Sequence, residues 1–281
     1  MALSFFLHIC ISELVLKINN NVMEQTQNKP KFPTEVVTLP SKGLLYPEGH
    51  PLKSGTVEMK YMTAKEEDIL TNQNYINKGI VIDKLLESLI VTPGLDYNDL
   101  LIGDKNSMLV AARILGYGAD YTFKRTNPSS GEEEEITVDL TDADDKLIDE
   151  SLLAEGRNEF SFTLPTTNIP ITFKLLTQKD EYQIDRELKG LKKINKNNAP
   201  ELTTRLKHVI TSVNGDSELK TIREFVDETM LAKDARALRE YSKKVMPDID
   251  LNFDLEYENG HIEDNVKIPI GVNFFWPDAS V

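Results

Sequence analysis

The chain has 281 residues, of which 40% are hydrophobic and 28% are charged, a composition typical of a soluble globular protein. Its formal net charge of −14 disfavours non-specific binding to nucleic acid or to an anionic membrane surface, because phosphates and acidic headgroups repel it. The single cysteine, Cys10, excludes an intramolecular disulfide and a cysteine-based zinc site.

Residues 1–31 are predicted to be a poorly ordered or artefactual tail. A signal peptide has basic residues before its apolar run, and none precedes the apolar first part of this segment. Glu13 and Lys17 interrupt the apolar stretch, which is therefore unlike a membrane span. Met23 opens a segment typical of a natural amino terminus. Residues 1–22 are therefore interpreted either as the product of an upstream start codon or as a short amphipathic helix packed on the body.

An amino-terminal α+β half is expected over residues 32–158. It opens with an arm rich in Pro and Gly, 32–60, in which short extended pieces alternate with turns. A helix is predicted over 63–71, because Thr63 followed by Glu66 forms the capping-box pattern.

Two further helices are predicted from apolar residues at helical spacing. The first, 80–91, stops before a Pro-Gly pair, and the second, 104–118, ends at Gly116 and Gly118, which favour left-handed caps. Their predicted inward residues are Ile82, Leu85, Leu86 and Leu89 in the first helix, and Met108, Leu109, Ala112 and Leu115 in the second.

The period then changes to two residues. Residues 120–140 predict a β-hairpin with its turn at 127–131. The adjacent glutamates at 132–135 indicate a solvated strand, since an EF-hand calcium loop needs acids at alternating positions around a glycine. Residues 141–155 are predicted to form a short acidic helix with Thr141 as its N-cap.

The carboxy-terminal half, 159–281, is also expected to be α+β. Alternating apolar residues predict a hairpin over 159–177 and a last one over 248–281, where Asn259-Gly260 signals a type I′ turn. Helices are predicted between them, over 177–195, 203–215 and 218–245, the last broken near 232–234.

Basic residues gather in this half, and they are Lys192, Lys193, Lys196, Arg205 and Lys207. A solvated helix face balanced by nearby acids is the preferred interpretation, and a nucleic-acid patch is the alternative. No dinucleotide, Walker, serine-hydrolase or paired-histidine motif is present. The residues alone thus predict an α+β fold with helical layers and several β-hairpins, the last at the carboxy terminus, and no evident active site.

An ordered series of short motifs carries a family resemblance. They are Leu39-Pro40-Ser41-Lys42-Gly43 with Tyr46-Pro47, then Glu66-Glu67-Asp68-Ile69-Leu70, Leu164-Pro165, Pro247 with Ile249-Asp250, and a terminal Phe274-Phe275-Trp276-Pro277. In this order they make the chain resemble the T-even-type phage baseplate hub assembly family over residues 36–278. Relatives in that family often carry Cys-x-x-Cys pairs in two hairpins, which suggests a zinc ribbon. This chain has no cysteine in the hairpins at 120–140 and 248–281, so we expect no zinc and no other cofactor, and hairpins held by packing and Asn-Gly turn chemistry.

The resemblance implies a non-enzymatic protein of tail morphogenesis, either a baseplate hub component or an assembly factor absent from the finished particle. It implies other phage baseplate hub proteins as partners, with no small-molecule substrate, nucleic acid or membrane. The expected place is the host cytoplasm during assembly or the virion tail baseplate. The alternatives are a DNA- or tape-measure-binding tail module that uses the basic stretch at 186–207, and a hub-associated cell-wall hydrolase, for which no lysozyme-like setting of a glutamate is present.

Candidate interface residues lie in the first and last motifs, and no catalytic, cofactor or metal residue is predicted. Pro-fixed extended segments lose little entropy on docking and suit addition to a partner's sheet. Neighbouring residues on a strand face opposite ways, so one of Phe274 and Phe275 is expected to meet a second surface, in this chain or in a partner. The candidates are Leu39, Pro40, Tyr46, Phe274, Phe275, Trp276 and Pro277.

Overall fold

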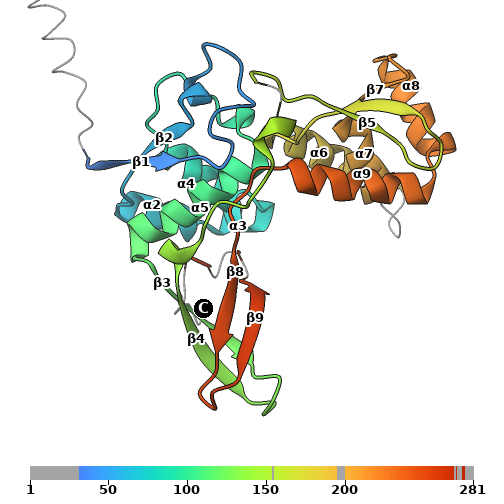
Figure 1. Ribbon diagram of the computed structural model, residues 1–281. Coiled ribbons are helices and arrows are strands. Elements are labelled where there is room, and N and C mark those ends of the chain that lie inside the picture. Colours follow the sequence, from blue (N-terminus) through green and yellow to red (C-terminus); the bar gives the residue numbers. More distant parts are fainter. Residues whose placement is uncertain (1–31, 154, 195–199, 269, 271–273, 276–281) are drawn as a thin grey trace, which may run out of the picture. The chain divides into compact units, whose positions relative to one another are not determined.

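Short helices and small sheets alternate along the chain in a computed structural model that describes residues 32–153, 155–194, 200–268, 270 and 274–275 (Figure 1). The strands are β1 (Thr34–Thr38), β2 (Thr56–Lys60), β3 (Asp120–Thr126), β4 (Glu133–Asp139), β5 (Phe160–Thr163), β6 (Pro170–Phe173), β7 (Ile210–Val213), β8 (Asn252–Glu256) and β9 (Ile262–Lys267). The α-helices are α2 (Ala64–Leu70), α3 (Gln73–Lys78), α4 (Val81–Leu89), α5 (Ile102–Tyr117), α6 (Gln178–Ile194), α7 (Glu201–Val209), α8 (Leu219–Glu224) and α9 (Ala232–Val245). Single turns of 3₁₀-helix are η1 (Pro51–Ser54), η2 (Tyr97–Asp99), η3 (Leu140–Asp142) and η4 (Glu150–Leu152), and η5 (Phe225–Thr229) is a π-helical turn.

The sheets pair β1 with β2, β3 with β4, β8 with β9, and β5 with β6 and β7 in the order β5-β6-β7. This confirms the predicted α+β class and the last hairpin towards the carboxy terminus. Described residues from Glu35 onward belong to one compact unit. The division into halves at 32–158 and 159–281 stays a prediction, and the predicted tail at 1–31 lies outside the described residues.

The capping box at the start of α2 is present and is part of a larger buried network. Thr63 donates to Oε2 of Glu66 from its backbone N–H at 3.0 Å and from its hydroxyl at 2.6 Å. Oε1 of Glu66 accepts from Lys60 Nζ at 2.8 Å and from the Ser88 hydroxyl at 2.7 Å. The Glu66 side chain is fully buried and so joins β2, α2 and α4. Burial raises the pKa of Glu66, but the hydrogen bonds from Lys60, Thr63 and Ser88 outweigh it and lower that pKa to about 2.

The helices predicted at 80–91 and 104–118 are α4 and α5, but the left-handed caps predicted for the second are not formed. Gly118 is the C-cap of α5 with a φ of 86° and a ψ of 171°, outside the left-handed helical region, and Gly116 lies inside the helix. A Cβ at Gly116 would come within 2.4 Å of the Met62 sulfur, so the glycine lets the Met62 side chain pack closely on the helix. Ile82 and Leu115 are partly buried, and the other predicted inward residues are buried.

Two segments differ from the prediction because distant backbone takes up their hydrogen bonds. Residues 141–155 form η3 and η4 with an irregular stretch between them, capped by Asp139 and Asp149 and not by Thr141. In that stretch the Asp144 carbonyl accepts from the Asp250 N–H at 2.7 Å. The helix predicted over 203–215 ends at Val209, and the chain continues as β7 because β6 offers a free edge to pair with.

The last hairpin forms as predicted between β8 and β9, but its turn is not type I′. Gly260 has a φ of 77°, while Asn259 does not have the positive φ that a type I′ turn requires. The Gly260 N–H donates to the Tyr257 carbonyl at 2.8 Å, and the Tyr257 N–H donates to the His261 carbonyl at 2.9 Å. One left-handed glycine therefore closes a loop longer than two residues.

Hairpins β3–β4 and β8–β9 lie side by side (Figure 1), joined by side chains. Arg125 on β3 donates to both carboxylate oxygens of Glu263 on β9, at 3.0 and 2.6 Å. The Tyr257 hydroxyl donates to Glu263 at 2.8 Å, and the Glu258 N–H donates to Glu134 on β4 at 2.8 Å. A bidentate ion pair therefore links the two hairpins, a contact that the sequence analysis did not predict.

The α9 helix covers the β5–β6 part of the three-stranded sheet. Tyr241 on α9 stacks on Phe162 with ring centroids 4.8 Å apart and meets Phe173 edge-on at 5.9 Å. At the start of α9 the buried carboxylate of Asp234 accepts from the backbone N–H groups of Thr166 and Thr167 at 2.8 and 3.2 Å. The helix thus has an aromatic contact with strands β5 and β6 and a polar contact with the loop between them.

The amino end of α5 packs closely on the segment after α9. A Cβ at Gly103 would lie 1.8 Å from the Pro247 carbonyl oxygen, which no side chain permits. Asn106, one turn later, donates to Asp248 at 2.9 Å. The first turn of α5 thus packs directly against the motif Pro247-x-Ile249-Asp250.

Gly103→Ala is expected to lower the free energy of unfolding by about 2 kcal/mol, because the backbone must move to admit the methyl group. Gly190→Ala is the matched control, since Gly190 is also inside a helix but a Cβ there meets no atom within 4 Å. The control is expected to gain about 0.5–1 kcal/mol from helix propensity. Urea titrations followed by circular dichroism measure both, and an equal response of the two variants would contradict the packing assigned to Gly103.

Glu66→Gln is expected to remove an acid-sensitive part of the stability. The pKa of Glu66 is about 2 in the fold against an ordinary 4.5, so its ionised form stabilises the fold by about 3 kcal/mol above pH 4.5, and this is lost as the pH falls towards 2. The difference in unfolding free energy between wild type and variant should therefore shrink from pH 6 to pH 2. Glu135→Gln, on an exposed strand position, is expected to change stability by less than about 0.5 kcal/mol and serves as the control.

Candidate functional site

Segment 39–47, the first motif of the chain, is bound to the start of α5 through one buried carboxylate. Oδ1 of Asp104 accepts from the Ser41 backbone N–H at 3.0 Å. Oδ2 accepts from the Ser41 hydroxyl at 2.7 Å and from the Tyr46 hydroxyl at 2.8 Å. The Tyr46 oxygen in turn accepts from the Leu101 backbone N–H at 3.1 Å. Each polar group of this cluster therefore serves the attachment of the arm to the helix.

The backbone of the motif turns where only a small residue fits. Gly43 has a φ of 74°, and a Cβ there would come within 2.3 Å of the Lys53 carbonyl oxygen. Gly55 has a φ of 75°, and its Cβ would lie 2.7 Å from the Lys42 backbone. The Leu39 N–H donates to the Gly55 carbonyl at 2.9 Å. Two glycine turns thus lie against each other and hold Ser41 in position over Asp104.

The electrostatics of this cluster suit a structural role. Asp104 has 0% exposure, and burial raises its pKa against the opposing effect of the hydrogen bonds from Ser41 and Tyr46. Burial, together with the Asp104 charge, also raises the pKa of Tyr46. A catalytic carboxylate must reach a substrate, whereas both oxygens of Asp104 accept hydrogen bonds from its own fold.

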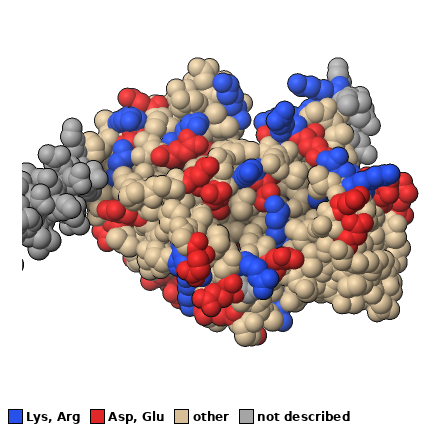
Figure 2. All heavy atoms as spheres, turned by 90° about the horizontal axis from the view of Figure 1, so that it is seen from above, with Lys and Arg blue, Asp and Glu red and all other residues tan. Residues whose placement is uncertain are grey.

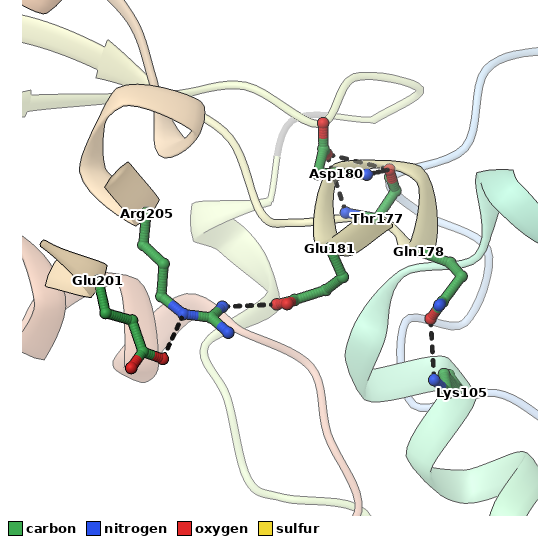
Figure 3. Close-up of polar contacts among 7 residues, drawn as sticks. All are labelled: Lys105, Thr177, Gln178, Asp180, Glu181, Glu201 and Arg205. Carbon is green, nitrogen blue, oxygen red and sulfur yellow. Dashed lines mark hydrogen bonds and ion pairs between the residues drawn. The ribbon is translucent and has the colours of Figure 1, made fainter. Parts of the chain in front are cut away.

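Next to this cluster, α5 and α6 meet at their amino ends. The Ile102 N–H donates to the Leu176 carbonyl at 3.2 Å, and the Gln178 N–H donates to the Leu100 carbonyl at 2.8 Å. Figure 3 shows Gln178 pointing at Lys105 across this junction, where Lys105 Nζ donates to Oε1 of Gln178 at 2.9 Å. The residues ahead of the two helices thus exchange backbone hydrogen bonds, and a side-chain pair closes the junction.

Lys105 also takes part in a partly buried ion pair. Its Nζ lies 2.7 Å from Oδ1 of Asp83 on α4, and the Tyr97 hydroxyl donates to the same oxygen at 2.8 Å. Burial is the largest cause of a raised pKa at Tyr97 and, close by, at Tyr182, and the Asp83 charge adds to it. Helices α4, α5 and α6 are therefore tied by one lysine.

The start of α6 carries two further polar contacts (Figure 3). The backbone N–H and the hydroxyl of Thr177 each donate to Oδ2 of Asp180 at 3.0 Å, which caps the helix. Arg205 on α7 donates to Glu181 at 2.7 Å and to Glu201 at 3.5 Å. Arg205 belongs to the predicted basic region and is neutralised here, as is Lys207, which pairs with Asp227 at 2.7 Å.

Two grooves border the junction. One, of about 470 Å³, has Ile82, Ile102 and Leu109 as apolar lining and Lys105, Gln178 and Glu181 as polar lining. The other, of about 400 Å³, lies between η2 and α6, and its lining includes Asp96, Asp99, Lys179, Tyr182 and Arg186. In the first groove, Lys105 and Gln178 are hydrogen-bonded to each other, and Glu181 is paired with Arg205.

The predicted interface residues that the structure describes all lie inside the fold. Leu39, Tyr46, Phe274 and Phe275 are at most 4% exposed, and Pro40 is buried as well. Phe274 and Phe275 are both buried because they are not on a strand, where successive side chains would alternate, but in a tight turn with rings edge to face at 5.5 Å. Trp276 and Pro277 lie outside the described residues. Burial gives the described residues a role in the fold, and their contact with a partner stays a prediction.

Arg113 holds the terminal motif, and the sequence analysis did not identify it. Its guanidinium, nearly fully buried, donates to the carbonyl oxygens of Phe274, Gly118 and Asp120 at 3.0, 2.7 and 2.9 Å. Burial lowers the pKa of Arg113. The sequence does place this arginine on the apolar face of the helix predicted at 104–118. A charged residue in such a position needs hydrogen-bond partners inside the fold, and this was the signal that could have identified it.

Other classes of site find no support in the described ranges. No group of three or more His, Cys, Asp or Glu side chains is placed to hold a metal ion in this part of the chain. Among the helices that the structure describes, none is both long enough and apolar enough to cross a membrane.

Comparison with known proteins gives one family. The family described as T4 bacteriophage base plate protein matches residues 33–276. No curated protein matches the chain, and no solved structure matches it. The matched range contains segment 39–47, the whole α5–α6 junction and both linked hairpins.

Tyr46→Phe is expected to lower the free energy of unfolding by about 1–3 kcal/mol, because it leaves the Leu101 N–H without its acceptor and Asp104 with one donor fewer. Tyr61→Phe is the control, since Tyr61 is 36% exposed, and it is expected to cost less than about 0.5 kcal/mol. Urea titration of both variants measures the difference. Equal effects at the two tyrosines would contradict the role of the Asp104 cluster.

Proposed function

Because the chain belongs to the T4 bacteriophage base plate protein family, we propose that it is a component or an assembly factor of the baseplate hub that acts by protein–protein interaction. The family match over residues 33–276 carries this proposal. The assignment to the hub is supported by the ordered motifs, from Leu39-Pro40-Ser41-Lys42-Gly43 to Phe274-Phe275-Trp276-Pro277, that resemble the hub assembly family. The partners are other baseplate proteins of the same phage.

The use of buried acids supports a structural and non-enzymatic role. Glu66, Asp104 and Asp234 are fully buried, and each accepts hydrogen bonds from donors in its own fold. Each of them joins segments that are distant in sequence or belong to different elements. Such contacts stabilise a defined surface for a partner, whereas a catalytic acid needs an open approach for a substrate.

The place of action follows from the same premise. The protein acts in the host cytoplasm while tails are assembled, and as a hub component it is also part of the virion tail baseplate. Contact of the candidate interface residues with a partner remains part of this proposal, although the candidates that the structure describes, Leu39, Pro40, Tyr46, Phe274 and Phe275, are buried in the fold. Trp276→Ala tests this, because loss of stability with unchanged co-purification of hub proteins assigns the motif to the fold.

Quantitative mass spectrometry of purified phage particles and of infected-cell lysate tests the proposal. Peptides at the stoichiometry of other hub subunits in the particles are expected for a component, and peptides in the lysate alone are expected for an assembly factor. In either case a phage that lacks the gene should make no tails with complete baseplates. Complete, infective tails from that mutant would contradict the proposed function.

A turbidity assay on peptidoglycan tests the non-enzymatic part of the proposal. The purified chain is expected to clear the suspension no faster than buffer, with lysozyme as the positive control. Clearing by the wild type that is lost on substitution of a single exposed carboxylate would favour a cell-wall hydrolase instead.

A further inference from the structure

One face of α6 is basic, and Lys179 and Arg186 on it border the groove that Asp96 and Asp99 also line. Lys179, Arg186 and Lys193 recur at intervals of seven residues, so they lie on one face of the helix, and all three are exposed. The opposite face carries buried Ile184. Within the part of the chain that the structure describes, these three residues make no ion pair, whereas Lys189 pairs with Asp185. Figure 2 shows acidic and basic side chains side by side across one face of the molecule. Basic residues without an ion pair along one helix differ from that mixed pattern and from the net charge of −14.

Gly190 lies on the same face, between Arg186 and Lys193. It is exposed, and a Cβ there would meet no atom within 4 Å. Glycine inside a helix costs about 1 kcal/mol relative to alanine, and no contact among the described residues requires it at this position. A glycine that leaves the helix backbone bare between two basic side chains suits a group that approaches from another molecule.

A matching feature lies in the segment 142–150, between η3 and η4. Leu147 is 98% exposed, and the carboxylates of Asp142, Asp144 and Asp149 on either side of it are exposed as well. From Asp144 to Asp149 the chain spans at most about 16 Å when extended, and Arg186 and Lys193 are about 10 Å apart along the helix. The long side chains of Arg186 and Lys193 can reach outward to cover the difference between these two spacings. The order acid, leucine, acid is therefore complementary to the order base, glycine, base.

We propose that segment 142–150 of one copy binds the exposed face of α6 of a second copy, with Leu147 over Gly190 and the carboxylates against Arg186 and Lys193. The contact is between two different surfaces, so it generates a ring or an open chain of copies rather than a closed symmetric pair. A nucleic acid on α6 would leave Leu147 without a partner, and the second copy accounts for both features. The proposal goes beyond the proposed function and does not depend on it.

Sedimentation velocity of the purified full-length chain tests the contact. At about 100 µM protein the sample is expected to sediment above the mass of one chain in about 50 mM salt and to approach the monomer in about 500 mM salt, since charge pairs are screened. A monomer in both conditions would overturn the proposal. Association that does not respond to salt would overturn the charge pairing.

Leu147→Ser is expected to weaken the association by about tenfold or more, because the leucine side chain that the contact would bury is lost. Leu219→Ser is the matched control, since Leu219 is 69% exposed on α8 and outside the contact, and it should leave the association unchanged. Both sites are exposed, so circular dichroism should report the same fold for both variants. Equal association of the two variants would exclude Leu147 from the interface.

Charge exchange identifies the two surfaces. Arg186→Glu with Lys193→Glu is expected to abolish the association, and adding Asp144→Lys with Asp149→Lys in the same chain is expected to restore it. Failure of the fourfold variant to associate would contradict the pairing of these surfaces. Retention of a short DNA duplex by a monomeric wild type, lost in Arg186→Glu, would assign the face of α6 to nucleic acid and overturn the proposal.

Discussion

The described structure depends on the enclosed carboxylate of Asp104 and on the helix turn that carries it. A buried carboxylate is costly unless every oxygen finds a donor, and segment 39–47 supplies donors from a backbone N–H and two hydroxyls. Because the arm must stay over α5 to provide them, its two glycine turns and its tyrosine are constrained together. The same turn of α5 packs on Pro247 and exchanges hydrogen bonds with Gln178, so the arm, the start of α6 and the segment after α9 meet at one place.

The same solution recurs at Glu66 and Asp234. Each lies near the start of a helix and accepts from a loop or strand that the helix must hold, so an acid that begins as a local cap becomes a long-range attachment. This use of acids is compatible with a chain of net charge −14, because the charges that are buried are matched by donors and the others remain in water. Such attachments hold the segments that they join in one arrangement.

The paired hairpins illustrate how one arrangement can be held by different chemistry. The family resemblance suggests metal-binding cysteines in hairpins of this kind, and this chain has none there. Between β3 and β9 it has instead the bidentate Arg125–Glu263 pair, supported by the Tyr257 hydroxyl. An ion pair of this geometry fixes orientation as well as distance, which is what two short hairpins with small individual cores require.

The sequence by itself determined the elements whose hydrogen bonds are local. The capping box at Thr63 and the helical periods of α4 and α5 depend on residues within a few positions of one another, and those predictions agree with the structure. The hairpins also form where they were predicted, but the turn at Asn259-Gly260 is not the predicted type I′ turn. The family could likewise be recognised from the sequence, because the order of its motifs along the chain can be seen without knowing which residues they contact. Tertiary structure alone decided that residues 141–155 leave the helical conformation and that β7 joins β6, since their partners are distant in sequence. It also decided that Leu39 and Phe274 are buried, because an apolar residue in a sequence fits a core and an interface equally well. Only the folded chain shows that Asp104 binds segment 39–47 and that Arg113 binds Phe274 within the same molecule.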